Sequence, residues 1–332
     1  MRVPAPAKID LHLRVGPPRG DGFHPLLTWI VTVGLFDTLT LVRKREFRAQ
    51  PVRGTGEQGP PDPNRRNEIL TLSSDHPSLP CDGRNLVVRA ATALADHVRR
   101  IAKDATDRPI GRDATGTERR LDPVSAYLNK RIPPGAGLGG GSSDAAAALR
   151  GLDHLWKRNL SLDELSALGA SLGSDVPFFL GGSSSICAGR GEIVRLTAPP
   201  DICRWVVLAL PKIELSTPAV YRRFDELNLG SSASLDEEPD WSAWAKMPAA
   251  ELVPRLRNDL EPAAFALRPE LGELRQELER RLGRMVRMSG SGSSLFTLCD
   301  AGDEAATMAR QAREDASIDA IAVPIEPMLQ MI

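Results

Sequence analysis

The chain is expected to adopt an α+β fold divided into two domains. Its 332 residues carry strand patterns, then helix patterns, then strand patterns again, without the strict alternation that a parallel α/β sheet requires. A glycine-rich segment in the middle of the chain leads directly into an alanine-rich helix pattern. The prolines after Ala198 mark the expected boundary, so we predict domains at residues 1–198 and 199–332.

The beginning of the chain carries a clear strand pattern. Apolar and polar residues alternate there with the period of a β-strand, which places Lys8 and Asp10 on one face. A second segment is rich in β-branched and apolar residues and predicts one or two strands, interrupted near Gly34 and Asp37. These two segments are residues 3–15 and 28–42.

Two polar segments interrupt the N-terminal half. Each contains too few apolar residues to bury a core, so we expect exposed loop insertions at residues 44–67 and 104–120. Between them, apolar residues at helical spacing predict a helix at residues 85–101. Residues 124–132 are expected to form the strand that enters the glycine-rich segment.

The rest of the chain mixes helix and strand signals. Ser161 and Glu164 form a capping-box pattern that predicts a helix start, and Gly173 predicts the end of that helix, followed by a turn. The expected helices are residues 160–172, 216–227, 249–256 and 269–282. The expected strands are a hairpin at 183–196 and single strands at 205–210, 286–289 and 294–299, with a polar connector at 231–247.

Composition and charge exclude several classes of protein. The formal net charge of -1 gives no electrostatic reason to expect a nucleic-acid or membrane partner, and no apolar run is long enough to span a bilayer. The four cysteines are scattered without a C-x-x-C pair, which is typical of reduced thiols and not of a zinc site or a disulfide framework. We therefore expect a cytoplasmic protein, either a monomer or a homodimer.

The glycine-rich segment predicts a phosphate-binding loop. Glycines leave backbone N–H groups uncovered, and the N-terminus of the following helix attracts negative charge. A Walker loop is excluded because no lysine follows the last glycine, and the dinucleotide pattern is weak because Asp163 and Glu164 lie at a helix start instead of a strand end. The predicted phosphate-binding residues are Pro133, Pro134, Gly135, Ala136, Gly137, Leu138, Gly139, Gly140, Gly141, Ser142 and Ser143.

Other polar residues carry no function when they are taken singly. Lys8 is compatible with a solvated charge at a strand edge, and Asp175 with a helix cap or a turn. His24 is compatible with a loop cap, and the glycines around Ser291 with a tight hairpin. Only their order along the chain and their neighbours distinguish them.

Three segments together resemble the motifs of the GHMP small-molecule kinases. They are Pro6-Ala-Lys8-Ile, residues 133–143, and Met288-Ser-Gly-Ser-Gly-Ser293. Asp21-Gly-Phe-His24 and Leu172-Gly-Ser-Asp-Val-Pro-Phe-Phe179 are similar to a single branch of that family. The resemblance runs from the first residue to about Asp300, interrupted by the two insertions. It implies a two-domain fold with the active site in the interdomain cleft.

The resemblance also implies a reaction. That branch transfers a phosphoryl group from ATP to the 2-hydroxyl of a cytidine-diphosphate methylerythritol, in the non-mevalonate route to isoprenoids. By the same resemblance Asp175 is the general base, and Lys8 lies beside it to stabilise the developing alkoxide. No cluster of cysteine, histidine or carboxylate residues suggests a metal held by the protein, so Mg²⁺ is expected to be carried by ATP.

Substrate contacts follow from the resemblance as well. The family holds cytosine between aromatic rings, which Phe23 and Tyr221 would provide, and reads its edge with a histidine, which His24 would provide; Tyr221 fits a half-buried helix position equally well. Asp10 stands where the family usually has asparagine, and a carboxylate accepts hydrogen bonds without donating any. The C-terminal motif contributes three further expected contacts, Gly290, Ser291 and Gly292.

Two alternatives stay open at this point. The first is another GHMP kinase, acting on homoserine, mevalonate or a sugar; the Gly-Phe-His and Gly-Ser-Asp-Val-Pro motifs argue against it. The second is a non-catalytic ligand-binding member of the family, against which the retention of Lys8 and Asp175 argues. In each case the expected partner is a small molecule.

Overall fold

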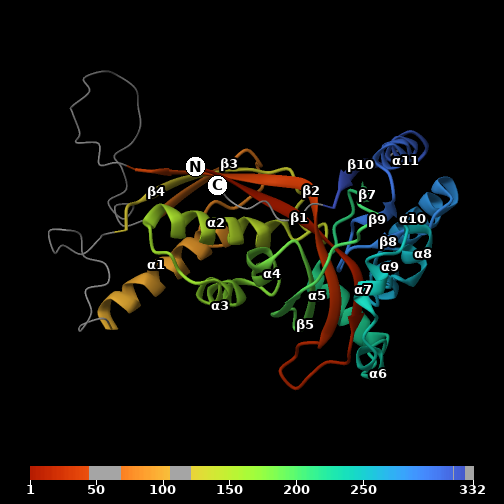
Figure 1. Ribbon diagram of the computed structural model, residues 1–332, viewed down its shortest axis with the longest axis horizontal. Helices are drawn as coiled ribbons and strands as arrows, with labels where there is room; N and C mark the ends of the chain where they lie inside the picture. The colour runs from red at the N-terminus through yellow and green to blue at the C-terminus, as the bar shows by residue number, and fades with distance from the viewer. Residues whose placement is uncertain (45–68, 105–120, 317, 326–332) are drawn as a thin grey trace.

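The computed structural model describes residues 1–44, 69–104, 121–316 and 318–325. The insertions expected at residues 44–67 and 104–120 lie outside the described residues, apart from Lys44 and Asp104. The described chain forms two sheets with helices packed against them, which confirms the α+β class (Figure 1). The boundary at residue 198 stays a prediction.

The larger sheet has six strands and is built around β2. Its path runs β3-β4-β2-β5-β6, and β1 also pairs with β2. The β3–β4 pair is parallel, and the other pairs are antiparallel. The strands are β1 (Arg2–Val15), β2 (Leu26–Arg43), β3 (Leu70–Ser74), β4 (Val124–Asn129), β5 (Ser184–Gly189) and β6 (Ile193–Leu196).

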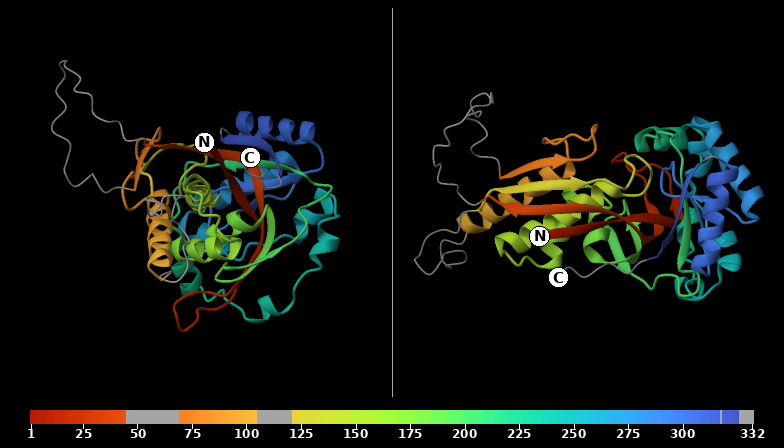
Figure 2. Two further views of the ribbon diagram at one scale, coloured as in Figure 1. Left: turned by 60° about the vertical axis from the view of Figure 1, so that its left-hand side comes forward. Right: turned by 90° about the horizontal axis from the view of Figure 1, so that it is seen from above.

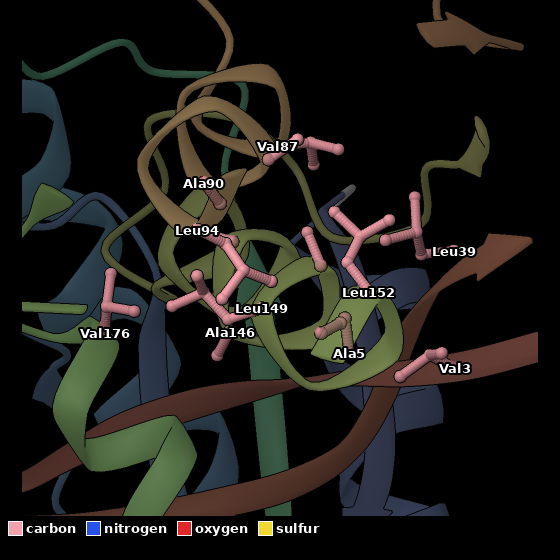
Figure 3. Packing of buried hydrophobic residues seen from close by; sticks show 14 of the residues in the cluster. Val3, Ala5, Leu39, Val87, Ala90, Leu94, Ala146, Leu149, Leu152 and Val176 are labelled. Atoms are coloured by element: carbon pink, nitrogen blue, oxygen red, sulfur yellow. The ribbon is translucent and has the colours of Figure 1, made fainter. Parts of the chain in front are cut away.

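Four helices enclose the first hydrophobic core: α1, α2 and α4 pack against this sheet, and α3 packs against those three helices. Figure 3 shows Leu94 of helix α1 and Leu149 of helix α2 among the side chains that fill this core, together with Val3 of β1. The alanines of the second helix allow it to approach the strands closely. These helices are α1 (Leu86–Asp104), α2 (Gly140–Trp156), α3 (Leu162–Leu172) and α4 (Val176–Gly181).

The C-terminal part forms a four-stranded antiparallel sheet in the order β10-β7-β9-β8, with helices around it (Figure 2). The strands are β7 (Trp205–Leu210), β8 (Arg287–Met288), β9 (Leu295–Cys299) and β10 (Asp319–Pro324). The helices are α5 (Thr217–Glu226), α6 (Ala233–Asp236), α7 (Trp241–Trp244), α8 (Ala249–Leu252), the 3₁₀ turn η2 (Val253–Arg255), α9 (Glu261–Leu267), α10 (Pro269–Leu282) and α11 (Gly302–Asp315).

The two sheets share a hydrophobic core, so their relative position is fixed by packing. Ile9 of β1 and Trp29 of β2 are buried with Leu208 of β7 and Phe296 of β9 in one continuous cluster. An isolated β-bridge pairs Leu13 of β1 with Asn258, which lies shortly after η2, and adds a backbone contact. This packing places the second half of β1 and the turn between β8 and β9 on the wall of one cavity.

Several expected elements differ in the structure. The break expected near Gly34 and Asp37 is a register shift within one continuous strand β2, because the bulge absorbs the irregular residues. The turn expected after Gly173 is a short helix, α4, with Pro177 in its first turn. The polar connector contains the short helices α6 and α7, and β3, α9, α11 and β10 were not expected. Within the described residues, no helix combines the length and the apolar character needed to cross a membrane.

Candidate active site

A cavity of about 880 Å³ lies between the two halves and collects most of the predicted site residues. Strand β1 contributes Lys8 and Asp10, the segment before β2 contributes Phe23 and His24, and the start of α4 contributes Asp175. The C-terminal half contributes three predicted residues, Tyr221, Gly290 and Ser291, and the glycine-rich segment lines the cavity from Pro133 to Ser142. Two predicted residues, Ser143 and Gly292, do not lie on the cavity wall.

The glycine-rich segment ends in a helix whose N-terminus has no side-chain cap. Helix α2 begins at Gly140, its cap position is Gly139 in the left-handed region, and no side chain accepts a hydrogen bond there. Ser142, Ser143 and Asp144, whose residue types favour helix N-caps, lie inside the helix instead and do not cap it. Backbone N–H groups at an uncapped helix start, together with the helix dipole, favour an anion, so this end of the cavity fits a phosphate chain.

Close packing of backbone explains one glycine of this loop. Gly137 has φ of +75°, and a Cβ atom there would lie 2.4 Å from the carbonyl oxygen of Ser289 and 2.9 Å from that of Gly292. Both the left-handed conformation and the contact with the C-terminal turn exclude a larger side chain. The loop is thereby packed directly against the C-terminal motif.

Lys8 lies between two carboxylates at the centre of the cavity. It forms a buried ion pair with Asp10, and its Nζ lies 3.8 Å from Oδ2 of Asp175. The pKa of Lys8 is raised: burial favours the neutral amine, but the charges of Asp10 and Asp175 outweigh that effect. The ammonium group is therefore the stable form at neutral pH.

Asp175 is the loosely held member of this cluster. It occupies the cap position of α4 but makes no side-chain cap hydrogen bond, and a third of its side chain is exposed to the cavity. Desolvation raises the pKa of the Asp175 carboxyl group, the positive charge of Lys8 opposes that rise, and the negative charge of Asp10 adds to it. A carboxylate with a raised pKa and no structural hydrogen bond is suited to accept a proton.

Asp10 is held more firmly than Asp175. Its Oδ1 accepts a hydrogen bond from the hydroxyl of Thr28 at 3.1 Å, and its backbone N–H donates to Oγ of Ser289 at 3.2 Å. The Cβ position of Gly290 lies 3.1 Å from Asp10 Oδ2, so the C-terminal turn covers the Lys8–Asp10 pair. Thr28 was not predicted; it lies on the neighbouring strand, and only the pairing of β1 with β2 brings it here.

An aromatic group also lines the cavity. The ring of Tyr221 on α5 lies 5.0 Å from that of His24, and Phe23 is 52% exposed beside them. Arg190, from the turn between β5 and β6, lies 4.7 Å from the centre of the Phe23 ring. These residues provide flat apolar surfaces next to hydrogen-bonding groups, which is the chemistry that a nucleobase requires.

His24 is held in one tautomer. Its Nδ1 lies 3.1 Å from the carbonyl oxygen of Gly16, which can only accept, so Nδ1 carries the proton. Desolvation lowers the pKa of His24, although Asp225, 3.4 Å from Nε2, opposes that effect. The two ring nitrogens therefore each face an acceptor oxygen, that of the Gly16 carbonyl at Nδ1 and that of the Asp225 carboxylate at Nε2.

A second buried lysine, which sequence reasoning missed, supports the phosphate loop. Lys130, just after β4, forms a buried ion pair with Asp37 of β2 and donates to Oδ2 of Asp144 at 2.9 Å. Burial raises the pKa of Asp144 to about 7, with Lys130 opposing and Asp37 adding to the rise. The only signal in the sequence was Asp37, a polar residue inside an apolar strand pattern.

Comparisons with known proteins agree with this architecture. Residues 85–183 match the model for the GHMP kinases N-terminal domain, and residues 237–317 match the model for the GHMP kinases C-terminal domain. The chain belongs to the GHMP kinase family, and it is an ATP-dependent small-molecule kinase.

Its relatives within this family include several proteins named 4-diphosphocytidyl-2-C-methyl-D-erythritol kinase. The protein of this name from Nocardioides sp. is 39% identical, with 92% of this chain and 90% of the relative covered. That from Bacillus pumilus is 37% identical, with 89% and 86% covered. Both fall within the branch that the Gly-Phe-His and Gly-Ser-Asp-Val-Pro motifs indicated.

Solved structures give the same result. A crystal structure of a 4-(cytidine 5'-diphospho)-2C-methyl-D-erythritol kinase superposes with a TM-score of 0.66 at 33% identity, over 97% of this chain and 98% of that chain. A homoserine kinase from Cytophaga hutchinsonii superposes with a TM-score of 0.63 at 15% identity, over 99% and 95%, and supports the fold alone.

Proposed function

We propose that this kinase transfers the γ-phosphoryl group of ATP to the 2-hydroxyl of 4-diphosphocytidyl-2-C-methyl-D-erythritol, in the non-mevalonate route to isoprenoids. The observation that carries the proposal is the arrangement of three groups in one cavity. The glycine loop with the uncapped start of α2, the aromatic group around Tyr221 and the Lys8–Asp175 pair all line this cavity. The relatives that carry this name cover nearly the whole chain.

Asp175 is the group that accepts the hydroxyl proton in this proposal. Its carboxylate is partly exposed to the cavity and has no structural hydrogen-bond partner at the helix start. Lys8 keeps it ionised and lies where it can stabilise the oxyanion that forms as the proton leaves. Because the cation and the base are on different elements, their separation depends on the packing of β1 against α4.

The loop from Pro133 to Ser142 binds the triphosphate through backbone N–H groups. Positioning and charge neutralisation are the main demands of phosphoryl transfer, and both fit an uncapped helix N-terminus. Mg²⁺, carried by ATP, neutralises charge on the phosphates when it is bound. Within the described residues no group of three or more His, Cys, Asp or Glu side chains could hold a metal ion.

Substrate selection falls to the aromatic end of the cavity. Phe23 and Tyr221 provide faces for cytosine, and the ring of His24 provides a polar contact for the edge of the base. A substrate without a cytidine, such as homoserine or mevalonate, leaves these groups without a partner. Discrimination by unsatisfied buried polar groups is large, about 10⁴-fold in favourable cases.

The experiment offers the purified protein MgATP with one acceptor at a time and measures ADP release. We expect turnover with the cytidine-diphosphate substrate and not with homoserine or mevalonate, and a ³¹P signal for a phosphate ester at the 2-position of the product. The Asp175→Asn protein, purified identically, reports contaminating kinases. Turnover with another acceptor would assign a different GHMP activity, and absence of turnover with every acceptor would favour a non-catalytic member.

A further inference from the structure

The hydroxyl of Ser289 joins the two halves of the catalytic apparatus. It donates a hydrogen bond to the carbonyl oxygen of Gly137 in the phosphate loop at 3.0 Å, and it accepts one from the backbone N–H of Asp10 on β1 at 3.2 Å. Ser289 is fully buried and precedes the Gly290–Gly292 turn. One side chain thus contacts the backbone of both the nucleotide loop and the lysine-bearing strand.

The side chain of Asn258 fixes the turn that carries Ser289. Nδ2 of Asn258 donates to the carbonyl oxygens of Met288 and Gly290 at 2.8 and 2.7 Å, on either side of Ser289. Oδ1 of Asn258 accepts from the backbone N–H of Leu260, so the orientation of the amide is fixed. All polar atoms of this buried side chain are engaged, which makes the turn a rigid platform.

We propose that Ser289 is a positioning residue that sets the distance between the bound γ-phosphate and the Lys8–Asp175 pair. Ser289 lies between the phosphate loop and strand β1, and its hydroxyl contacts backbone atoms of both. The phosphate loop and the strand β1 each bind their own part of the reactants, so loss of the hydroxyl leaves either binding site intact. What changes is the alignment of the two sites, which is felt only when the phosphoryl group is transferred.

The inference rests on the proposed function, and a matched pair of serines tests it. Ser294 is five residues away, is also buried, and its hydroxyl has no hydrogen-bond partner among the described residues. Its bond to the phosphate loop is made by its backbone N–H, which donates to the carbonyl oxygen of Ala136 at 3.1 Å. Ser294→Ala therefore removes a buried hydroxyl of the same size without removing a contact.

The expected result is a split between kcat and KM. Ser289→Ala should lower kcat with the cytidine-diphosphate substrate about 10- to 100-fold, because misplacement of about 1 Å is costly in a transfer reaction. The KM for ATP and the KM for the cytidine-diphosphate substrate should each stay within about threefold of the wild-type value. Ser294→Ala should retain wild-type kcat. Ser289→Cys, which keeps the size of the side chain and a weak donor, should give an intermediate kcat.

Unfolding curves separate positioning from stability. A lower Tm for Ser289→Ala with wild-type kcat in the folded protein would assign Ser289 a purely structural role and overturn the inference. An equal loss of kcat in Ser294→Ala would also overturn it. If Ser289→Ala does not fold, wild-type kcat in Ser289→Cys contradicts the proposal, and a reduced kcat supports it. Failure of the wild-type protein to turn over the cytidine substrate would instead reject the proposed function.

Discussion

Lys8 and Lys130 are each buried between two aspartates, but the two clusters are held in different ways. Around Lys130, Asp37 and Asp144 both lie within hydrogen-bond distance of the ammonium group, and the side chains of all three are at most 4% exposed. Around Lys8, Asp10 is tightly paired, whereas Asp175 lies 3.8 Å away with a third of its side chain exposed. The same charges thus form a closed cluster in one place and an open one in the other.

The difference indicates what distinguishes a reactive carboxylate from a structural one. A buried lysine bound by two carboxylates holds segments together, and the Lys130 cluster joins β2, the end of β4 and the start of α2 in this way. A carboxylate held only by a cation at longer range keeps lone pairs available for a substrate proton. Charge composition alone does not separate the two cases; exposure and hydrogen-bond partners do.

The largest expected effect is a difference in kcat between a variant of the Lys8 cluster and a variant of the Lys130 cluster. Asp175→Asn should lower kcat at least 100-fold, since general bases contribute about 10²–10⁴-fold, with little change in nucleotide binding. Asp144→Asn, which keeps an oxygen for Lys130, should lower kcat less than tenfold. Steady-state kinetics with the cytidine substrate measures both. Similar losses in the two variants would remove the distinction between an open and a closed cluster.

The second effect tests whether the closed cluster supports the phosphate loop. A Cβ atom on Gly140 would lie 2.9 Å from Nζ of Lys130 and 2.9 Å from Ile132, and Lys130 cannot move without leaving its carboxylates. Gly140→Ala should therefore weaken ATP binding about tenfold, which is about 1.4 kcal/mol. At Gly141 an added Cβ meets only Leu86, at 3.5 Å, so Gly141→Ala is the matched control. Calorimetry that gives equal ATP affinities for the two variants would contradict this account.

A third, smaller effect concerns stability and pH. Asp144 has a folded-state pKa of about 7, above its ordinary value, so the folded protein keeps a proton that the unfolded chain loses near pH 4. Its contribution to the free energy of unfolding therefore falls as the pH rises from about 4 to 7. Asp144→Asn removes this loss, so its stability relative to the wild-type protein should increase by about 1 kcal/mol or more between pH 5 and pH 8.

Urea unfolding at the two pH values measures this change. Asp153, at the other end of α2, also has a pKa raised by burial, so Asp153→Asn should show a change of the same sign. A stability difference between Asp144→Asn and the wild-type protein that does not vary with pH would place Asp144 outside the titrating cluster.

Local sequence was sufficient to predict the parts of the site that depend on consecutive residues. The glycine loop, the strand with Lys8 and the segment with Asp175 each carry their chemistry within a few positions, and the structure brings them to one cavity. The Lys130 cluster could not be predicted in this way, because Asp37 is 93 residues from Lys130 and its partnership depends on the sheet.

The same reason explains the other differences. Ser289 was read as part of a hairpin, and its contacts with Gly137 and Asp10 arise only when the C-terminal turn packs on both elements. The short helix α4 was missed because six residues carry too little periodicity to distinguish a helix from a turn. Long-range pairing, and not residue type, was the missing information in each case.

The most direct test of the open cluster is the pH dependence of kcat in Asp10→Asn. Asparagine at this position keeps an oxygen for Thr28 but removes a charge that raises the pKa of Asp175. We expect kcat/KM to stay within about tenfold of the wild-type value, so the profile can be measured at saturating MgATP and substrate. Asp144→Asn serves as the control for a carboxyl group outside the open cluster.

The account predicts that the acidic limb of the kcat profile moves to lower pH in Asp10→Asn and stays in place in Asp144→Asn. The sign follows because activity requires ionised Asp175, and loss of the neighbouring negative charge makes ionisation easier. An acidic limb that does not move in Asp10→Asn, or that moves to higher pH, would contradict the assignment of Asp175 as a base whose charge is set by Lys8 and Asp10.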